Sequence, residues 1–248
     1  MKKVFWIFIL ASFSMQSQII NVESLRLVTD TTGWAGSVGL NLDIYKNTRD
    51  LVRIKNHIHV QYKTPKHLVL FMNSISFDRA DGSEFVNKGV QHLRYNYRIK
   101  PRLNWEAFVQ NQYNAISKIT YRRLVGTGPR YKLLSSDKYK MYMGSLLMYE
   151  NEKTSEDTPV LHKDWRNSSY FSFSFFFTKT VKLVSTTYYQ PKLSAFDDYR
   201  VAHQSALFLK LYKNLSFKTT FKYNYDVFPV EGIPSVDYGL TNGLMYKF

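Results

Sequence analysis

The sequence predicts an all-β protein, an antiparallel up-and-down transmembrane β-barrel of about twelve strands. Three observations lead to this fold class. Apolar and polar residues alternate with a period of two through most of the chain after Trp34, as in half-buried strands. Aromatic residues make up 17 % of the chain, and many lie toward the ends of the alternating stretches. The N-terminus has the composition of an export signal.

The first residues, MKKVFWIFILASFSMQSQ, have the three regions of a secretory signal peptide. Two lysines precede an apolar run over residues 4–13, and small and polar residues follow it. A membrane-spanning helix needs roughly 20 apolar residues, so this run is too short to be one. We expect cleavage near Ser17, with residues 1–18 as the signal peptide and residues 19–248 as one barrel domain. An uncleaved anchor at the membrane surface is the alternative.

The expected strands follow one another with turn signals between them and no segment of helical periodicity. Five stretches alternate cleanly: 35–47, 51–62, 92–99, 170–178 and 215–227. Less regular alternation predicts strands at 66–77, 103–115, 119–134, 138–151, 181–192 and 199–212, and residues 235–248 form the last. Many of these strands are longer than the 5–6 residues most common in soluble proteins, which favours a membrane barrel.

Loop lengths alternate along the chain. The segments DRADGSEF, NEKTSEDTPVLHKDW, LSAFDD and VEGIP fall at one end of the expected barrel. The other end has the tight turns KTPK, KPR, SSDK, TKT and YKN. Long loops at one end and short turns at the other are typical of outer-membrane barrels. A soluble periplasmic β-barrel, with its apolar face inside, has the same alternation and is the alternative architecture.

The composition excludes several functions. The chain has no cysteine, which excludes disulfides, thiolate metal sites, cysteine nucleophiles and a lipid-anchored cysteine. The net charge of +15 is typical of nucleic-acid-binding proteins, but the basic residues are dispersed and export separates the chain from cytoplasmic nucleic acid. We therefore expect no nucleic-acid partner. Lys and Arg near a barrel rim suit anionic lipid, including the phosphates of lipopolysaccharide.

Four motifs in the middle of the chain, RYNY, WEAFVQNQYN, RRLVGTGPR and GSLLMYE, come in that order. With the surrounding strands they resemble DUF481, a family of unknown function whose members are labelled salt-induced outer-membrane proteins. The resemblance covers most of the mature chain and implies an outer-membrane β-barrel of a Gram-negative envelope. It implies no catalytic residues, because the biochemical role of the family is unsettled.

Charged and amide side chains of these motifs share the polar faces of neighbouring strands. The predicted lumenal network consists of Arg94, Asn96, Arg98, Glu106, Gln110, Gln112, Asn114, Arg122, Arg130, Lys140 and Glu150. Buried charges must be paired, so we expect hydrogen bonds and salt bridges among them. Two interpretations stay open. The network is either a polar plug that makes the barrel rigid, or a selectivity zone or ligand site that prefers anions because arginine is in surplus.

His57 and His59 lie two residues apart on one strand face, a spacing that can bind a metal. No third ligand is recognisable, so we expect lumenal histidines and neither a metal nor a cofactor. Serine and histidine are abundant, but the sequence has no G-x-S-x-G motif and no familiar Ser–His pairing. We expect a protein that is not an enzyme. An outer-membrane enzyme that modifies lipids, of the lipase or acyltransferase type, is the alternative.

Four acidic residues are expected in the longest outer loop, where they are solvated or bind divalent cations weakly. They are Glu150, Glu152, Glu156 and Asp157.

The last stretch, SVDYGLTNGLMYKF, alternates to the end of the sequence. Its apolar positions are expected to face lipid, and the strand is expected to pair with the first one, so that no sheet edge remains. Tyr246 and Phe248 resemble the signal that the outer-membrane assembly machinery reads. The expected protein is a monomer in the cell outer membrane that serves as a narrow channel or as a structural or stress-adaptive envelope protein.

Overall fold

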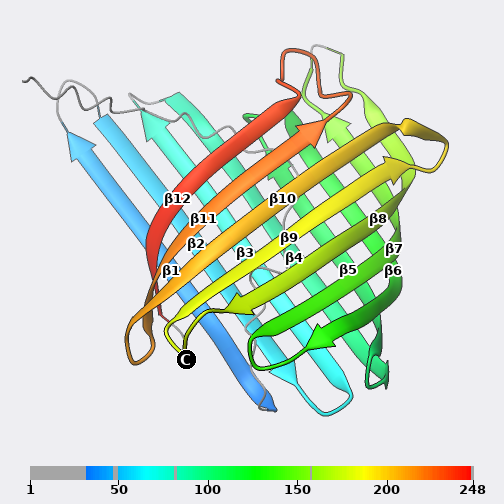
Figure 1. Cartoon of the computed structure of the whole chain (residues 1–248). Coiled ribbons are helices and arrows are strands. Elements are labelled where there is room, and N and C mark those ends of the chain that lie inside the picture. Colours follow the sequence, from blue (N-terminus) through cyan, green and yellow to red (C-terminus); the bar gives the residue numbers. More distant parts are fainter. Residues whose placement is uncertain (1–31, 47–49, 81–82, 157, 247–248) are drawn as a thin grey trace, which may run out of the picture.

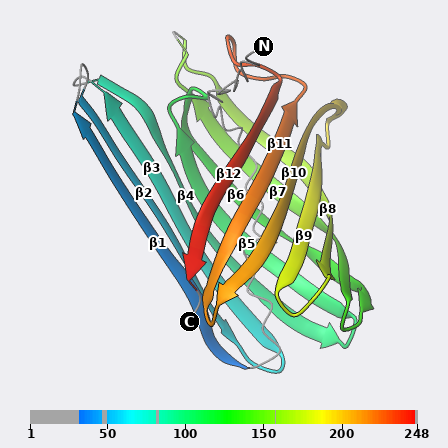
Figure 2. The same ribbon diagram turned by 60° about the vertical axis from the view of Figure 1, so that its left-hand side comes forward.

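The computed structural model describes residues 32–46, 50–80, 83–156 and 158–246. Twelve strands form one antiparallel sheet in chain order, which curves into a nearly closed barrel (Figures 1 and 2). They are β1 (Gly33–Lys46), β2 (Asp50–Lys63), β3 (His67–Ala80), β4 (Ser83–Lys100), β5 (Leu103–Asn114), β6 (Ile119–Ser135), β7 (Tyr139–Thr154), β8 (Leu161–Phe176), β9 (Val181–Lys192), β10 (Ala195–Tyr212), β11 (Leu215–Asp226) and β12 (Val236–Tyr246). The described residues contain no helix that could cross a membrane. The predicted signal peptide lies outside them.

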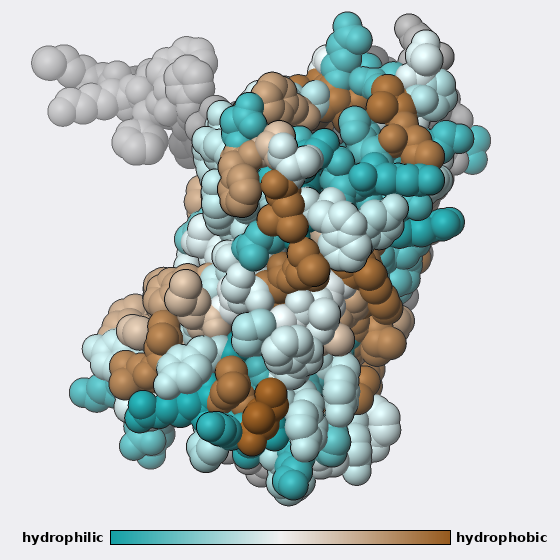
Figure 3. Space-filling model, turned by 90° about the vertical axis from the view of Figure 1, so that its right-hand side faces the viewer, coloured by the Kyte–Doolittle hydropathy of each residue, from teal (hydrophilic) through white to brown (hydrophobic). Residues whose placement is uncertain are grey.

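Each strand turns one set of side chains inward and the other outward. In β5, Glu106 and Gln110 are buried, whereas Trp105 and Val109 are almost half exposed. The outward positions of the barrel carry many apolar side chains, among them Val69, Phe71, Leu93, Val125, Leu147 and Phe171. Figure 3 shows apolar residues lying among pale, weakly polar ones on one side of the barrel, with strongly hydrophilic residues gathered toward the two ends. The inverted arrangement, apolar outside and polar inside, is the one predicted for a membrane barrel.

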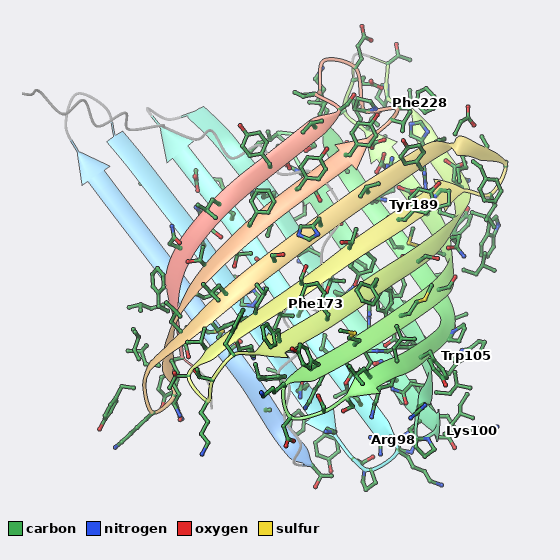
Figure 4. All side chains as sticks on the ribbon, viewed as in Figure 1. Arg98, Lys100, Trp105, Phe173, Tyr189 and Phe228 are labelled. Carbon is green, nitrogen blue, oxygen red and sulfur yellow. The ribbon has the colours of Figure 1, made fainter. Side chains whose placement is uncertain are left out.

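Exposed aromatic side chains lie toward the two ends of the outer surface. Trp105 lies near one end and Tyr189 toward the other (Figure 4). At the end where the short turns lie, the exposed aromatic residues include Trp34, Tyr62, Tyr97, Tyr139 and Tyr246. At the other end they include Trp165, Phe228 and Tyr238. Two such girdles flank the apolar band of known membrane barrels.

The connections at the two ends differ less than the sequence predicts. We call the ends the turn end, which has the links 64–66, 101–102, 136–138, 177–180 and 213–214, and the loop end. At the loop end, the links within NEKTSEDTPVLHKDW and LSAFDD shorten to 155–160 and 193–194. Residues 196–198 belong to β10 but have no partner in the ladder with β9, which shifts register there. The prediction of long loops there is wrong, because β7 and β8 continue through the first segment as paired strands and β10 begins within the second. The segment 227–235 is the longest loop between described strands.

The two edge strands are not joined by a ladder. β1 and β12 come near each other at the turn end (Figure 2), but among the described residues β1 pairs only with β2 and β12 only with β11. The prediction that the last strand pairs with the first is therefore wrong for this part of the chain. Glycine is frequent on these two strands, at Gly36, Gly39, Gly239 and Gly243, and glycine offers no side chain for cross-strand packing. Phe248 lies outside the described residues.

Candidate functional site

A first group of buried polar side chains surrounds Glu106 on β5; we call it the Glu106 cluster. Arg94 of β4 and Arg130 of β6 approach the carboxylate from the two neighbouring strands, at 3.4 and 3.3 Å. Asn96 donates to it at 3.0 Å, and the hydroxyl of Tyr170, three strands away on β8, donates at 2.6 Å. Glu106 is fully buried, so these four donors replace its hydration shell.

A second group lies nearer the loop end and surrounds Glu150 on β7; we call it the Glu150 cluster. Three buried arginines converge on this carboxylate: Arg122 and Arg200 reach Oε1 at 2.6 Å each, and Arg166 reaches Oε2 at 2.7 Å. Further carboxylates balance them. Arg122 and Arg200 also lie 3.4 and 3.5 Å from Glu152. The remaining pairs are Arg200 with Asp226 at 2.7 Å and Arg166 with Asp198 at 2.9 Å. The cluster ties together strands β6, β7, β8, β10 and β11.

An apolar layer lies between the two clusters on the inner face. It consists of Phe108, Leu124, Leu146, Met148, Tyr170, Tyr188 and Ala202. A cavity of about 20 Å³ remains there, bordered by Arg94, Phe108, Arg122 and Tyr188 among others. A space of this size holds about one water molecule. The side of the lumen formed by β5–β10 is therefore packed by side chains, and we call it the packed half.

The structure brings most of the predicted network residues together, but in two groups. Arg94, Asn96, Glu106 and Arg130 belong to the Glu106 cluster, and Arg122 and Glu150 to the Glu150 cluster. The three amides of β5 bind other partners: Gln110 and Gln112 are joined to His92 in a short chain, and Asn114 is bonded separately. His92 contacts Gln110 at 2.8 Å, Gln110 donates to Gln112 at 2.8 Å, and Asn114 donates to Ser117 at 2.7 Å.

Two predicted residues lie apart from the clusters. Arg98 has the inward-facing parity of β4 but is exposed at the turn end, where the barrel wall stops (Figure 4). Lys140 is half-buried at the same end of β7, with its Nζ 5.7 Å from the centroid of the Phe176 ring. The inclusion of Arg98 in a buried network is wrong, because the sequence pattern gives the face of a strand residue but not its height in the barrel.

The acidic residues also lie elsewhere than predicted. Glu150 and Glu152 are buried on the inner face of β7 and bind arginines, so they are neither loop residues nor free to hold cations. Glu156 is the one described member of the group in a loop; it accepts from the Thr154 hydroxyl at 3.0 Å. Asp157 lies outside the described residues. Among those residues, no group of three His, Asp or Glu side chains is placed to hold a metal.

The loop 227–235 bends over the packed half at the loop end. The backbone N–H of Glu231 donates to the carboxylate of Glu156 at 3.0 Å. The Nζ of Lys118, in the link between β5 and β6, donates to the carbonyl of Glu231 at 2.9 Å. These contacts join the loop to two other links, so the loop partly covers the mouth of the barrel.

The opposite side of the lumen is cationic and accessible. Lys55, His57, Lys88, Lys218 and Lys222 share the inner faces of β2, β4 and β11, and we call them the cationic strip. Lys55 is exposed and the other four are half-buried, unlike the arginines of the packed half. Lys88 interacts electrostatically with Lys222 and Lys55, and also with Asp78 and Asp237. Lys88 therefore lies among two other lysines and two aspartates.

Glycines stand directly opposite three members of the cationic strip. Gly39 of β1 pairs with His57, and on β12 Gly239 pairs with Lys222 and Gly243 with Lys218. A Cβ atom built on Gly239 or Gly243 would meet nothing within 4 Å, and one on Gly39 would have His57 atoms at 3.9 Å as its nearest contacts. The inner wall beside the strip is therefore open at these three glycine positions.

Two further histidines have polar or titratable neighbours. His59 is fully buried beside His57 on β2. On the outer face, His203 of β10 contacts the hydroxyls of Ser205 and Thr187 at 2.9 Å each. This pairing is absent from the predictions, and it has the arrangement of a nucleophile, a base and an orienting group. β10 is paired on both sides here, so its N–H groups belong to the ladders and leave no donor for an oxyanion.

Several partners in the clusters were missed by the sequence reasoning. They are Glu152, Arg166, Tyr170, Asp198, Arg200 and Asp226. Their signal was the inward parity of their strands. Glu152, Arg166 and Asp198 lie beyond the boundaries assigned from alternation, in β7, β8 and β10. The apolar layer was missed as well. Its signal was the short runs, such as the LLM of GSLLMYE, in which apolar residues occupy both faces of a strand.

Comparison with known proteins agrees with the fold. The family described as protein of unknown function, DUF481, matches residues 31–248. Among solved structures, the NanC porin is similar with a TM-score of 0.51 and 8 % identity, over 87 % of this chain and 99 % of that one. Two further structures are less similar. A bacterial polysaccharide outer membrane secretin has a TM-score of 0.46 and 9 % identity, over 87 % of this chain and 96 % of that one. The Pseudomonas putida toluene transporter TodX has a TM-score of 0.44 and 10 % identity, over 92 % of this chain and 83 % of that one. No curated protein matches.

Proposed function

The chain belongs to the DUF481 family, and we propose that it forms a narrow channel in the outer membrane that favours anions. The observation that carries this proposal is the division of the lumen. One half is filled by ion pairs and an apolar layer. The other half has the cationic strip facing glycine-lined open space.

The outer-membrane location has three supports. The fold is that of a porin barrel, with twelve antiparallel strands. Its outward side chains are largely apolar, and exposed aromatic residues lie toward both ends. In lipid the backbone must pair its own polar groups, which a nearly closed sheet achieves everywhere except at its seam. With short turns on the periplasmic side, the loop end faces the cell exterior.

The proposed roles of the two halves are different. The packed half holds the barrel wall in one shape, since its clusters join strands that are not neighbours in the sheet. The accessible half conducts. An anion there meets the positive charge of Lys218 and Lys222 across from Gly243 and Gly239, where no side chain fills the space. A charged side chain about 4 Å from an ion contributes about 1 kcal/mol even in bulk water, which is enough to set ion preference.

The proposed role is that of a channel and not of an enzyme. The similar solved structures include the NanC porin and the toluene transporter TodX. The hydroxyls around His203 face the lipid side at the middle of β10 and lack a carboxylate partner and an oxyanion donor. The assembly role of Tyr246 and Phe248, the monomeric state and the link to salt stress stay predictions from the sequence.

Ion selectivity tests the channel directly. We expect the purified barrel in a planar bilayer to conduct and to be anion-selective in a potassium chloride gradient. The double variant Lys88→Gln/Lys222→Gln should lower the chloride-to-potassium permeability ratio by about fivefold per lysine, because each lysine contributes about 1 kcal/mol. The matched control Lys138→Gln/Lys179→Gln removes the same charge from exposed turns and should leave the ratio unchanged. Absence of conductance, or a preference for cations, would refute the proposal.

A further inference from the structure

Three basic side chains form a compact patch on the outer surface near the loop end. Arg123 of β6, Lys153 of β7 and Lys163 of β8 are all exposed and have the outward-facing parity of their strands. We call them the outer basic patch. Arg123 pairs with Asn151, and Asn151 pairs with Lys163, so these residues lie in one row across three strands. Lys153 lies two positions further toward the loop end on β7.

The patch is small enough for one ligand. Neighbouring strands lie about 4.8 Å apart, which places the backbones of Arg123 and Lys163 about 10 Å apart. Lys153 stands about 7 Å from that row along the strand. The Arg123 guanidinium lies over the ring of Tyr121, at 4.6 Å from its centroid, which holds it on the outer surface. Long basic side chains at these separations can reach a common phosphate group.

The charge of the patch is not neutralised by the carboxylates of the same strands. Glu150 and Glu152 of β7 face inward and bind arginines. Asp164 of β8 also faces inward, with its carboxylate 2.8 Å from Lys192. The outward positions around the patch carry Tyr121, Val125, Tyr149, Asn151, Leu161 and Trp165, none of which is acidic. Three positive charges therefore lie together on the outer surface.

The height of the patch along the barrel axis, relative to the exposed aromatic residues, indicates the kind of ligand. Tyr149 and Trp165 are cross-strand partners with ring centroids 5.2 Å apart, and they lie directly on the turn-end side of the patch. Aromatic pairs of this kind lie at the membrane–water interface. The patch then lies just beyond it, where lipid phosphates are. On β9 to β12 the corresponding outward positions carry Tyr189, Tyr199, Tyr225 and Tyr238 without a basic cluster, so the feature is local.

We propose that the outer basic patch binds the phosphate groups of lipopolysaccharide in the outer leaflet. The inference rests on the proposed outer-membrane location and orientation, which place the loop end in that leaflet. The bound lipid would lie against one side of the barrel, formed by β6–β8. This side is also the wall of the packed half.

The test compares the full-length barrel with Arg123→Gln/Lys153→Gln/Lys163→Gln in phosphatidylcholine vesicles that contain lipopolysaccharide. Each basic residue near an anionic surface contributes about 1 kcal/mol, so the triple variant should bind lipopolysaccharide on the order of 100-fold more weakly. The control Lys66→Gln/Lys138→Gln/Lys179→Gln removes the same charge at the turn end and should bind like the wild type. If the triple variant folds poorly, Lys163→Gln alone should weaken binding about fivefold.

Dephosphorylated lipopolysaccharide should bind the wild type as weakly as intact lipopolysaccharide binds the triple variant. Equal binding of intact lipopolysaccharide to the wild type and the triple variant would overturn the inference. Complete displacement of the lipid by inorganic phosphate would also overturn it, since the patch would then be a site for free anions. Membrane fractionation separates this failure from that of the proposed function. A barrel found outside the outer membrane would refute both the proposed function and the lipid site. A barrel found in the outer membrane whose wild type and triple variant bind lipopolysaccharide equally would refute only the lipid site.

Discussion

Replacing Glu150 by glutamine is expected to destabilise the barrel by about 3–5 kcal/mol, the cost of removing one partner of a buried ion pair. The substitution keeps the volume of the side chain but removes the charge that three arginines share. Arg122, Arg166 and Arg200 each lie within 2.7 Å of this carboxylate, and each is buried. Glu152, Asp198 and Asp226 still match the three arginines in charge. Arg122, however, would keep only a 3.4 Å contact to Glu152, so a fully buried guanidinium would lose its closest partner.

The measurement is urea unfolding of the barrel folded in lipid vesicles, followed by tryptophan fluorescence. The matched control is Glu231→Gln, the same chemical change at an exposed loop position. A surface change of this kind should alter the free energy of unfolding by no more than about 0.5 kcal/mol. If Glu150→Gln costs no more than Glu231→Gln, the Glu150 cluster does not stabilise the barrel.

Gly128→Ala is expected to destabilise the barrel by about 1–3 kcal/mol, because the added methyl group has no space. Its Cβ would lie 2.7 Å from the Cα of Leu146 and still closer to the carbonyl oxygen of Ser145. Both are backbone atoms of β7, which cannot move aside as a flexible side chain can. β6 and β7 would have to separate where they carry the apolar layer.

Gly239→Ala is the control for this prediction. Gly239 is also a strand glycine of inward parity, but a Cβ there meets nothing within 4 Å. The alanine should be neutral or should stabilise by about 0.4–1 kcal/mol, because it restricts the unfolded chain. The measurement is the free energy of unfolding in urea of the two variants and the wild type. Equal effects at the two positions would show that the lumen is not divided into a packed and an open half.

Alternation alone predicted the strands because the face of a side chain depends only on its parity. Arg94, Glu106 and Arg122 were therefore assigned to the inner face, where the structure has them. Parity does not determine which inward residues meet across the lumen. The contact of Tyr170 with Glu106 spans three strands, and its existence depends on the curvature and stagger of the sheet.

Strand ends were less predictable than strand cores. The acidic and polar stretch after Glu150 has the composition of a loop, yet β7 and β8 continue through it to Thr154 and from Leu161. Tertiary pairing outweighs local composition there, because buried arginines of β6 and β10 hold Glu152 inside the barrel. The open seam was also unpredictable from pattern, since the alternation of β1 and β12 is regular although their glycines provide little packing.

The most direct test of a divided lumen is the reactivity of single cysteines, which the cysteine-free chain allows without background. Gly239→Cys places a thiol beside the cationic strip, and Ser172→Cys places one on the inner face of β8, where Ser172 is buried and accepts from the Thr186 hydroxyl at 2.8 Å. An anionic methanethiosulfonate reagent should react with Gly239→Cys and reduce its current in a planar bilayer, and should leave the current of Ser172→Cys unchanged. Equal modification of both variants, or block at Ser172→Cys alone, would contradict a channel that runs along β11 and β12.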